Sequence, residues 1–346
     1  MKTFIFSGET LKEAERFVSS SGEKPYRARQ VYEWIFKKNI FGFDSMTSLP
    51  KSFIALLKEK SAALTLSRVE RRISSKDGTR KYLFKLKDGN FVESVLLPSR
   101  DRVTVCLSTQ VGCPLGCIFC ATGKSGFRRN LEADEIVAQY LLMSRDYVRD
   151  TGKRVTNIVV MGMGEPFLNF APLNRALEIF SSDRGAGISP RRITVSTSGI
   201  ITGIDRFAEL AKHYKLSISL HSPYDDKRKK LIPLNKKYSL KKVLESADNY
   251  VEKTDRLVTF QYLMIKGIND TEDDAFELAR LLKDRKCKVN LIVYNSIKGL
   301  PFAKPGEKSI GRFTRILSSR GVLVTRRRSM GEDIESGCGQ LRAARL

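Results

Sequence analysis

Three of the six cysteines of this chain stand close together in the segment CPLGCIFC, residues 113–120. Cys113, Cys117 and Cys120 give the spacing C-x3-C-x2-C. A loop with this spacing can place its thiolates on three irons of a cubane iron–sulfur cluster and leave the fourth iron without a protein ligand. The segment therefore predicts a [4Fe-4S] cluster with one iron open to chemistry.

A structural zinc site is the alternative interpretation of these cysteines. Zinc prefers four protein ligands, and its usual sites combine paired C-x2-C or Cys/His spacings. Cys106 could serve as a fourth ligand, whereas His213 and His221 are the only two histidines of the chain, too few for a convincing Cys/His set. The spacing therefore favours the cluster.

Seven apolar runs of strand length alternate with amphipathic helical stretches from about residue 102 onward. The runs are VTVCLST, NIVVMG, RITVSTS, LSISLHS, VTFQYLMI, VNLIVYN and GVLVT. Strands that alternate with helices indicate parallel β/α units. We expect an α/β fold in which these units form a partial parallel (β/α) barrel, and an open doubly wound sheet is the alternative.

Small and polar residues follow several of these runs. The cysteine segment follows the first run. The small and polar residues at the ends of later runs lie at 162–166, 196–199, 219–222 and 294–295. The carboxyl ends of parallel strands meet on the face where β/α folds bind their ligands. We therefore expect these loops to form one ligand site together with the cysteines.

Two accessory segments precede the barrel. Pro25 and Pro50 stand near the starts of two amphipathic helical patterns, which indicate a small helical domain. Further on, Tyr82 and Phe84 alternate with charged neighbours, and Asp88-Gly89 supplies a hairpin turn. The predicted parts are a helical domain (1–64), a β extension (65–101), the barrel (102–328) and a C-terminal tail that carries Cys338 (329–346).

The chain carries a large excess of positive charge. It has 62 Lys and Arg against 38 Asp and Glu, a formal net charge of +24, with basic runs at 227–230 and 326–328. Such an excess favours nucleic acid as a partner, and a solvated basic surface is the plainer alternative. No apolar stretch is long enough to span a bilayer, and the first residues do not resemble a signal peptide. We expect a cytoplasmic protein, whose cysteines bind metal or perform redox chemistry.

Five motifs spread over the chain belong together. They are STQVGCPLGCIFCATG (108–123), GMGEPFLN (162–169), SLHSPYDDKR (219–228), YRARQVYEWIF (26–36) and GEDIESGCGQL (331–341). Together they resemble the RlmN/Cfr family of radical S-adenosylmethionine (SAM) adenine-C methyltransferases over essentially the whole chain. Cys106 and Cys338 are part of this resemblance, and a generic radical SAM enzyme needs neither. The resemblance implies a barrel of the radical SAM type and an RNA-binding role for the helical domain.

The resemblance also implies a role for each matching residue. The three clustered cysteines would bind the [4Fe-4S] cluster, whose open iron chelates SAM. Cys338 would take a methyl group from one SAM molecule, and a radical made from a second would activate that methyl group for addition to adenine. Cys106 would then release the product by forming a disulfide with Cys338, and Glu93 would act as the general base.

Further residues and partners follow from the same resemblance. The residues implied to contact SAM are Gly164, Glu165, Ser196, Ser219, Leu220, His221 and Asn295. The implied RNA substrates are 23S rRNA at the peptidyl transferase centre and the tRNA adenosine 3′ of the anticodon. An electron-donating reductase such as a flavodoxin system would serve a monomeric enzyme, with no membrane partner.

Single residues bear on the branch of the family. Pro166 and Val111 favour the RlmN branch, which methylates C2 of adenine, over the Cfr branch, which methylates C8. Ser296 and the pair Ser336-Gly337 depart from the proline and the two alanines common in the family, and the second departure bears on the mobility of the tail. Two alternatives lie outside the family. They are a zinc-stabilised RNA-binding protein without catalysis, and a radical SAM enzyme for a small molecule that leaves Cys106, Cys338 and the charge unexplained.

Overall fold

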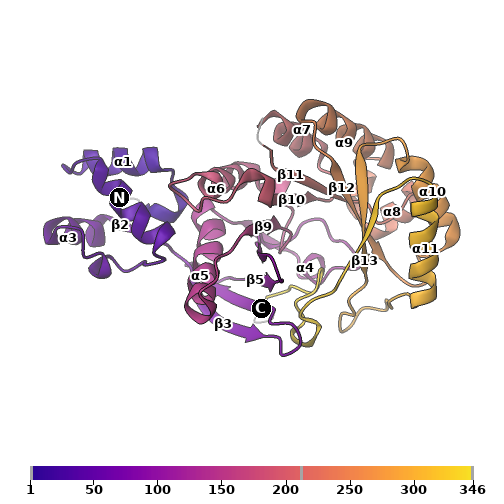
Figure 1. Cartoon of the computed structure of the whole chain (residues 1–346), viewed down its shortest axis with the longest axis horizontal. Coiled ribbons are helices and arrows are strands. Elements are labelled where there is room, and N and C mark those ends of the chain that lie inside the picture. Colours follow the sequence, from indigo (N-terminus) through magenta and orange to yellow (C-terminus); the bar gives the residue numbers. More distant parts are fainter. Residues whose placement is uncertain (1–2, 211–212, 344–346) are drawn as a thin grey trace.

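One ten-stranded sheet organises the chain, as described for residues 3–210 and 213–343 in a computed structural model (Figure 1). Its strand order is β14-β13-β12-β11-β10-β9-β6-β5-β4-β3. Among the described residues, β14 and β3 form its two edges and do not pair with each other. The sheet is therefore an open arc, which agrees with the expected partial barrel.

All seven predicted strands are present and run parallel to one another. They are β6 (Val103–Cys106), β9 (Asn157–Val160), β10 (Ile193–Thr197), β11 (Lys215–Ser219), β12 (Val258–Met264), β13 (Cys287–Val293) and β14 (Val324–Arg327). Their apolar residues are largely buried, many of them in the main hydrophobic core. The prediction of parallel β/α units is confirmed.

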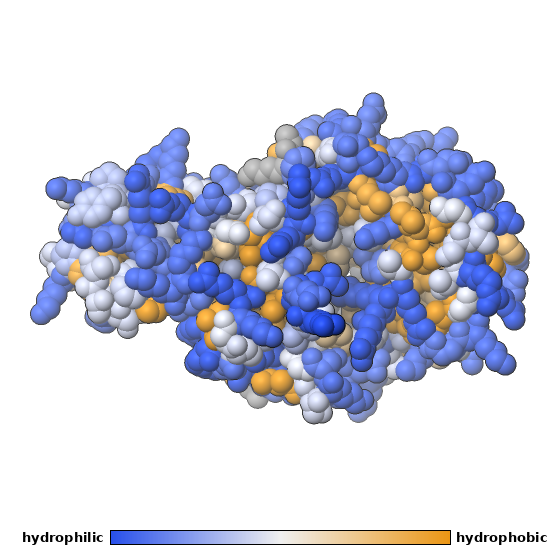
Figure 2. Space-filling view, in the orientation of Figure 1, coloured by the Kyte–Doolittle hydropathy of each residue, from blue (hydrophilic) through white to orange (hydrophobic). Residues whose placement is uncertain are grey.

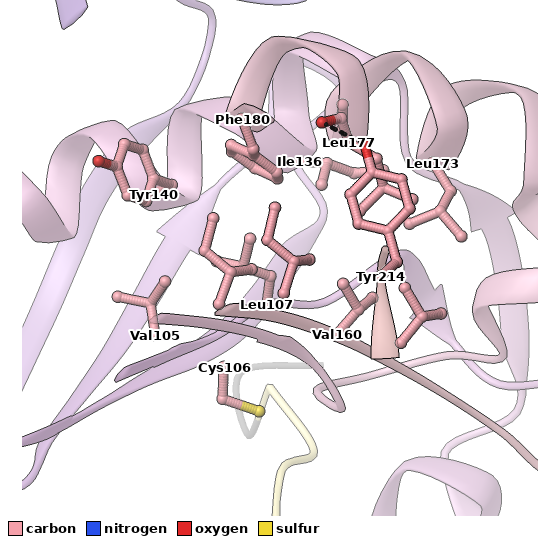
Figure 3. Close-up of a cluster of buried hydrophobic side chains, with 14 of the residues drawn as sticks. Val105, Cys106, Leu107, Ile136, Tyr140, Val160, Leu173, Leu177, Phe180 and Tyr214 are labelled. Carbon is pink, nitrogen blue, oxygen red and sulfur yellow. Dashed lines mark hydrogen bonds between the residues drawn. The ribbon is translucent and has the colours of Figure 1, made fainter. Parts of the chain in front are cut away.

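Helices connect these strands and cover the outer face of the arc (Figure 1). They are α5 (Ala133–Thr151), α6 (Phe170–Ser181), α7 (Ile201–Glu209), α8 (Asp225–Leu231), α9 (Leu240–Thr254), α10 (Glu272–Leu282) and α11 (Glu307–Ser319). Figure 3 shows Val105 and Leu107 of the β6 region pointing into the apolar layer that includes Phe180 of α6. Cys106 points to the opposite side, toward the tail, because side chains alternate along a strand. The core therefore lies outside the arc and leaves its inner face for the site.

A small hairpin carries the cysteine segment. β7 (Gln110–Gly112) and β8 (Phe127–Asn130) pair antiparallel, and the short helix α4 (Ala121–Lys124) follows the last cysteine. Gly112 has φ +75°, and a Cβ there would stand 1.8 Å from the carbonyl oxygen of Gly126. The hairpin is therefore closed so tightly at its base that position 112 accepts only glycine.

The β extension is part of the main sheet. β3 (Ser67–Ile73), β4 (Arg80–Lys85) and β5 (Phe91–Pro98) are antiparallel, and β5 pairs with β6. Arg80 binds Asp150 of α5 at 2.8 Å, and Arg68 binds Asp146 of the same helix. The extension is therefore fixed to the barrel by backbone and side-chain bonds.

The N-terminal helices lie beside α5 and α6 (Figure 1). This part comprises β1 (Phe4–Ile5), α1 (Leu11–Ser20), α2 (Tyr26–Tyr32), the π-helix η2 (Glu33–Lys37), α3 (Lys51–Lys60) and β2 (Ser61–Ala62). Arg175 of α6 holds Glu9 and Glu13 at 2.6 Å each. Burial would raise the pKa of Glu13, but this guanidinium and the hydrogen bonds from Thr10 lower it to about 2.

Short 3-10 helices complete the described secondary structure. They are η1 (Phe6–Gly8), η3 (Phe43–Ser45), η4 (Pro166–Asn169), η5 (Pro190–Arg192), η6 (Pro233–Lys236) and η7 (Glu332–Ile334). None of the helices in the described ranges is long and apolar enough to cross a membrane.

Candidate active site

A cavity of about 920 Å³, its open mouth included, lies at the carboxyl ends of the parallel strands, and we call it the cluster-loop cavity. The three cysteines of the segment CPLGCIFC line it. The predicted SAM residues that also line it are Gly164, Glu165, Ser196, Ser219 and His221. The structure therefore brings five of the seven predicted SAM residues together with the cysteines.

The cysteines fit an iron–sulfur cluster better than a zinc ion. All three thiols are free, and burial followed by neighbouring acidic groups raises the pKa of Cys113 to about 12 and that of Cys117 well above its usual value. Within the described ranges, no three Cys, His, Asp or Glu side chains converge on one metal-ion position. In a cubane each thiolate binds its own iron, so the sulfurs stand further apart than around one ion. Iron would supply the positive charge that keeps such buried thiols ionised.

Glu165 supplies a buried carboxylate to the cluster-loop cavity. One of its oxygens accepts the Ser198 N–H at 2.8 Å, and the other accepts the Phe167 N–H at 3.2 Å. Burial nevertheless raises the pKa of Glu165. A carboxylate held in this way suits the ammonium group of a ligand, which would offset its cost of burial.

His221 is buried in a strained left-handed conformation, with φ +59°. Its Nδ1 accepts the Leu263 N–H at 3.0 Å, and its ring meets the Phe119 ring edge-on, with the centroids 5.0 Å apart. Burial lowers the pKa of His221 to about 3. The imidazole is therefore neutral, with its proton on Nε2.

Arg228 is a site residue that the sequence analysis missed. Its guanidinium is completely buried and donates to the carbonyl oxygens of Ser198 at 2.7 Å, Ser219 at 3.0 Å and Leu220 at 3.1 Å, and to Asn235 at 2.5 Å. It therefore holds together the loops that follow β10 and β11. Leu220 itself packs in the core and does not line the cavity. The only available signal was the position of Arg228 at the end of the motif SLHSPYDDKR.

A second cavity of about 680 Å³ lies against the C-terminal tail, and we call it the tail cavity. Cys106 at the end of β6 and Cys338 of the tail both line it, and Figure 3 shows the Cys106 side chain directed toward the tail. Cys120, Met161 and Cys338 line both cavities, which are therefore adjacent. The structure thus brings the two predicted reactive cysteines together beside the cluster loop.

Arg327 stands beside the two cysteines of the tail cavity. The pKa of its guanidinium is raised mainly by Cys338, with a smaller contribution from Cys106, against the effect of burial. Burial, followed by Cys338, raises the pKa of Cys106 to about 12. Sequence reasoning placed Arg327 only in a basic run, and its position at the carboxyl end of the last strand was the signal that could have identified it.

Hydrogen bonds seat the tail against the cluster hairpin. The Gly339 carbonyl accepts the Ala121 N–H at 2.8 Å, and the Leu341 carbonyl accepts the Thr122 hydroxyl at 2.5 Å. Asn295 donates to the Cys338 carbonyl at 3.4 Å, so this predicted SAM residue lies in the tail cavity. A Cβ at Gly337 would stand 2.5 Å from Asn295 Nδ2, so the departure from the common alanine allows this approach.

Glu93 is buried on β5 and lines neither cavity. One carboxylate oxygen lies 3.1 Å from Lys81 Nζ, and the other accepts the Arg342 N–H of the tail at 2.8 Å. Val95, two residues further along β5, lines the tail cavity. Glu93 is therefore next to the cavity and separated from it by the tail. Cys287, at the start of β13, is buried and away from both cavities.

Known proteins resemble this chain over its whole length. A family model described as the Radical SAM superfamily matches residues 107–279, and one described as the ribosomal RNA large subunit methyltransferase N-terminal domain matches residues 7–62. Relatives named probable dual-specificity RNA methyltransferase RlmN include one from Bacillus velezensis, 44% identical over 339 residues, with 98% of this chain and 93% of the relative covered. One from Thermotoga maritima is 45% identical over 330 residues, with 95% and 94% covered.

A solved structure shares the fold throughout. The crystal structure of a radical SAM methyltransferase from Sphaerobacter thermophilus has a TM-score of 0.96 and 44% identity, with 98% of this chain and 99% of that chain covered. The full-length matches and the grouping of the cysteines on the inner face of the arc lead to the same assignment. The chain belongs to the RlmN family of radical SAM RNA methyltransferases.

Proposed function

We propose that this enzyme methylates C2 of an adenosine in 23S rRNA, at the peptidyl transferase centre, and C2 of the tRNA adenosine 3′ of the anticodon. The observation that carries the proposal is the pair Cys106 and Cys338 in one cavity, adjacent to that of the cluster cysteines. A radical enzyme for a small molecule needs no such pair. The name dual-specificity RNA methyltransferase, which the relatives carry, supports two RNA substrates.

The proposed site holds its cofactors through the residues of the cluster-loop cavity. Cys113, Cys117 and Cys120 bind the cluster, and Glu165 accepts a hydrogen bond from the ammonium group of SAM. When bound, the cluster supplies the electron that cleaves SAM to a 5′-deoxyadenosyl radical. Each turnover consumes two SAM molecules, because one provides the methyl group and the other the radical.

Cys338 carries the methyl group in the proposed reaction. C2 of adenine is too electron-poor to attack a sulfonium methyl group directly, so the methyl group passes first to the Cys338 sulfur. The 5′-deoxyadenosyl radical would remove one hydrogen atom from that methyl group, and the resulting carbon radical would add to C2. The adduct would then give one electron back to the oxidised cluster and lose its C2 proton to Glu93.

Cys106, once deprotonated, would attack the Cys338 sulfur, which breaks the bond from that sulfur to the methylene carbon and forms a disulfide. The released carbon would take up a proton and become the methyl group of the product. A reductase such as a flavodoxin system restores both thiols.

Glu93 needs a free lone pair for this role. The Arg342 N–H binds the carboxylate oxygen that does not face Lys81. Each carboxylate oxygen has two lone pairs, so Glu93 keeps the capacity to accept a proton in this arrangement. The remaining parts of the proposal are a monomeric enzyme in the cytoplasm, with the helical domain 1–64 in contact with the RNA.

The test begins with protein purified without oxygen and loaded with its cluster. After digestion, the peptide that contains Cys338 is weighed, and one extra methyl group is expected. The enzyme is then incubated with SAM, reductant and rRNA or tRNA fragments, and the methylated nucleoside is identified. A methyl group on C8 would place the enzyme in the Cfr branch, and an unmodified Cys338 in fully loaded protein would contradict the methyl-carrier mechanism.

A further inference from the structure

An open groove of about 1460 Å³ runs along the outside of the tail cavity. We call it the basic groove and define it by Lys76, Lys304, Arg326, Arg327, Arg328 and Ser329. These residues come from the β3–β4 turn, the loop before α11 and the end of β14. Arg327, Arg328 and Ser329 also line the tail cavity, so the groove and the tail cavity are adjacent.

The charge of the basic groove is positive and partly uncompensated. Five cationic side chains line it, together with the carboxylates of Asp77, Glu307 and Glu332. Two of these carboxylates form hydrogen bonds within the chain. Glu307 accepts two hydrogen bonds from Arg326, at 2.6 and 2.7 Å, and Asp77 accepts the Gly331 N–H at 2.8 Å.

Three exposed cations of the groove lie outside the ion pairs of the described residues, although Lys304 adds to the effect of Arg326 in lowering the pKa of Glu307. In the part of the chain that the structure describes, Lys76, Lys304 and Arg328 form no ion pair. Figure 2 shows strongly hydrophilic side chains gathered over the middle of the molecule, where the tail runs in Figure 1. Like charges that gather without partners cost free energy, and a polyanion placed among them removes this cost.

RNA is the polyanion that the position of the groove favours. The methyl group is carried on a cysteine of the tail cavity, so the target base has to enter that cavity while its sugar–phosphate backbone stays outside. An enzyme that acts on a base in this way extrudes the nucleotide and holds the flanking phosphates. None of the large exposed apolar side chains of the described residues lines the groove, which counts against an apolar protein partner.

We propose that the basic groove binds the RNA phosphates on either side of the target nucleotide, with Arg328 and Lys304 as phosphate contacts. This proposal rests on the RNA methyltransferase function. Arg328 lies at the junction of the groove with the tail cavity, so its phosphate is the one nearest the extruded base. Lys304 lies further out and binds a phosphate along the strand.

The test compares charge-removing variants of the full-length, cluster-loaded enzyme. The variant Arg328→Gln/Lys304→Gln is expected to bind a fluorescent RNA hairpin about tenfold more weakly than the wild type. The slope of log affinity against log salt concentration should become shallower by about one for each lost phosphate contact. The charge-keeping variant Arg328→Lys/Lys304→Arg should bind within about threefold of the wild type.

A matched control removes the same charge elsewhere. Lys241→Gln/Lys242→Gln changes two exposed lysines on the outer helix α9 and should leave the RNA affinity within about twofold. Equal affinity and equal salt slope in the groove variant and in this control would overturn the proposal.

Methylation of Cys338 needs no RNA. Measuring it therefore distinguishes failure of the proposed function from failure of the groove as an RNA site. This methylation should be unchanged in the single variant Lys304→Gln, whose side chain lines the basic groove and not the tail cavity. If the wild type itself fails to methylate Cys338 and RNA, the proposed function is wrong. If the wild type is active and only the binding difference is missing, the groove assignment alone is wrong.

Discussion

His221 makes the stability of the fold depend on pH, because burial keeps it neutral. Its pKa is about 3 in the folded chain against 6.5 when exposed. Below about pH 6.5, His221 therefore binds a proton in the unfolded chain and stays neutral in the folded chain. The free energy of unfolding falls as the pH falls toward 3. From about pH 7 to about pH 5.5 this loss is about 1 kcal/mol. Asn tolerates positive φ and keeps a hydrogen-bond acceptor. Between these two pH values, we expect the free energy of unfolding of His221→Asn, measured in urea, to fall by about 1 kcal/mol less than that of the wild type.

The second histidine provides the control for this experiment. His213 is exposed, so His213→Gln should retain the full loss of stability between the two pH values. An equal loss in the His221 and His213 variants would mean that His221 is not the titrating group.

Arg228 is the residue on which the cofactor loops depend most. The change Arg228→Met leaves three carbonyl oxygens and the Asn235 amide oxygen without their buried donor. Loss of one partner from a buried charged network costs about 3–5 kcal/mol, and we expect a loss of that size in the free energy of unfolding. Arg228→Lys should recover part of it, because the ammonium group reaches fewer of the acceptors. Chemical denaturation measures the free energy of unfolding of both variants. A loss below about 1 kcal/mol for Arg228→Met would contradict the role of Arg228 in holding these loops together.

At the scale of elements, the hairpin of β7 and β8 controls the cysteine segment. Gly112→Ala would place a methyl group 1.8 Å from the Gly126 carbonyl oxygen, whereas Gly116→Ala meets nothing within 4 Å. Both glycines have positive φ, so both variants carry the backbone strain of about 1 kcal/mol, and only Gly112→Ala must open the hairpin. We expect iron and sulfide content after reconstitution to fall severalfold for Gly112→Ala and to stay near the wild type for Gly116→Ala. Equal loading of the two variants would show that the base of the hairpin does not govern the cysteines.

The elements differ in how well local sequence predicted them. The seven parallel strands were predictable, because each is a short apolar run between polar loops, and their common direction followed from the helices between them. The pairing of β5 with β6 was not predictable, because the local sequence pattern of one strand carries no information about its partner. The places of Asn295 and Glu93 depend on the position of the tail, which is also a long-range contact. The motifs predicted the residues that gather around the cysteines better than the cavity that each one faces.

At the scale of the whole molecule, Arg175 joins the helical domain to the barrel. Glu13, held by Arg175, has its pKa lowered from 4.5 to about 2, so its contribution to stability is present above about pH 4.5 and is lost as the pH falls toward 2. The three side chains are partly exposed, so we expect Arg175→Met to cost only about 1 kcal/mol at neutral pH. Hydrogen exchange of α1 should become faster while that of β12 stays unchanged. Faster exchange in both would indicate general destabilisation in place of undocking.

The open arc of the main sheet has a consequence for the behaviour of many copies in solution. Its edges, β3 and β14, each present backbone groups that another chain could pair with, which is the usual route to strand-to-strand aggregation. Both edges are rich in arginine, with Arg68, Arg71 and Arg72 on β3 and Arg326 and Arg327 on β14. Charged side chains along an edge strand disfavour pairing with another chain, even where, as here, most of them are bound to carboxylates of the same chain. The arginines of the two edges thus also help to protect an open sheet from polymerising with its own copies.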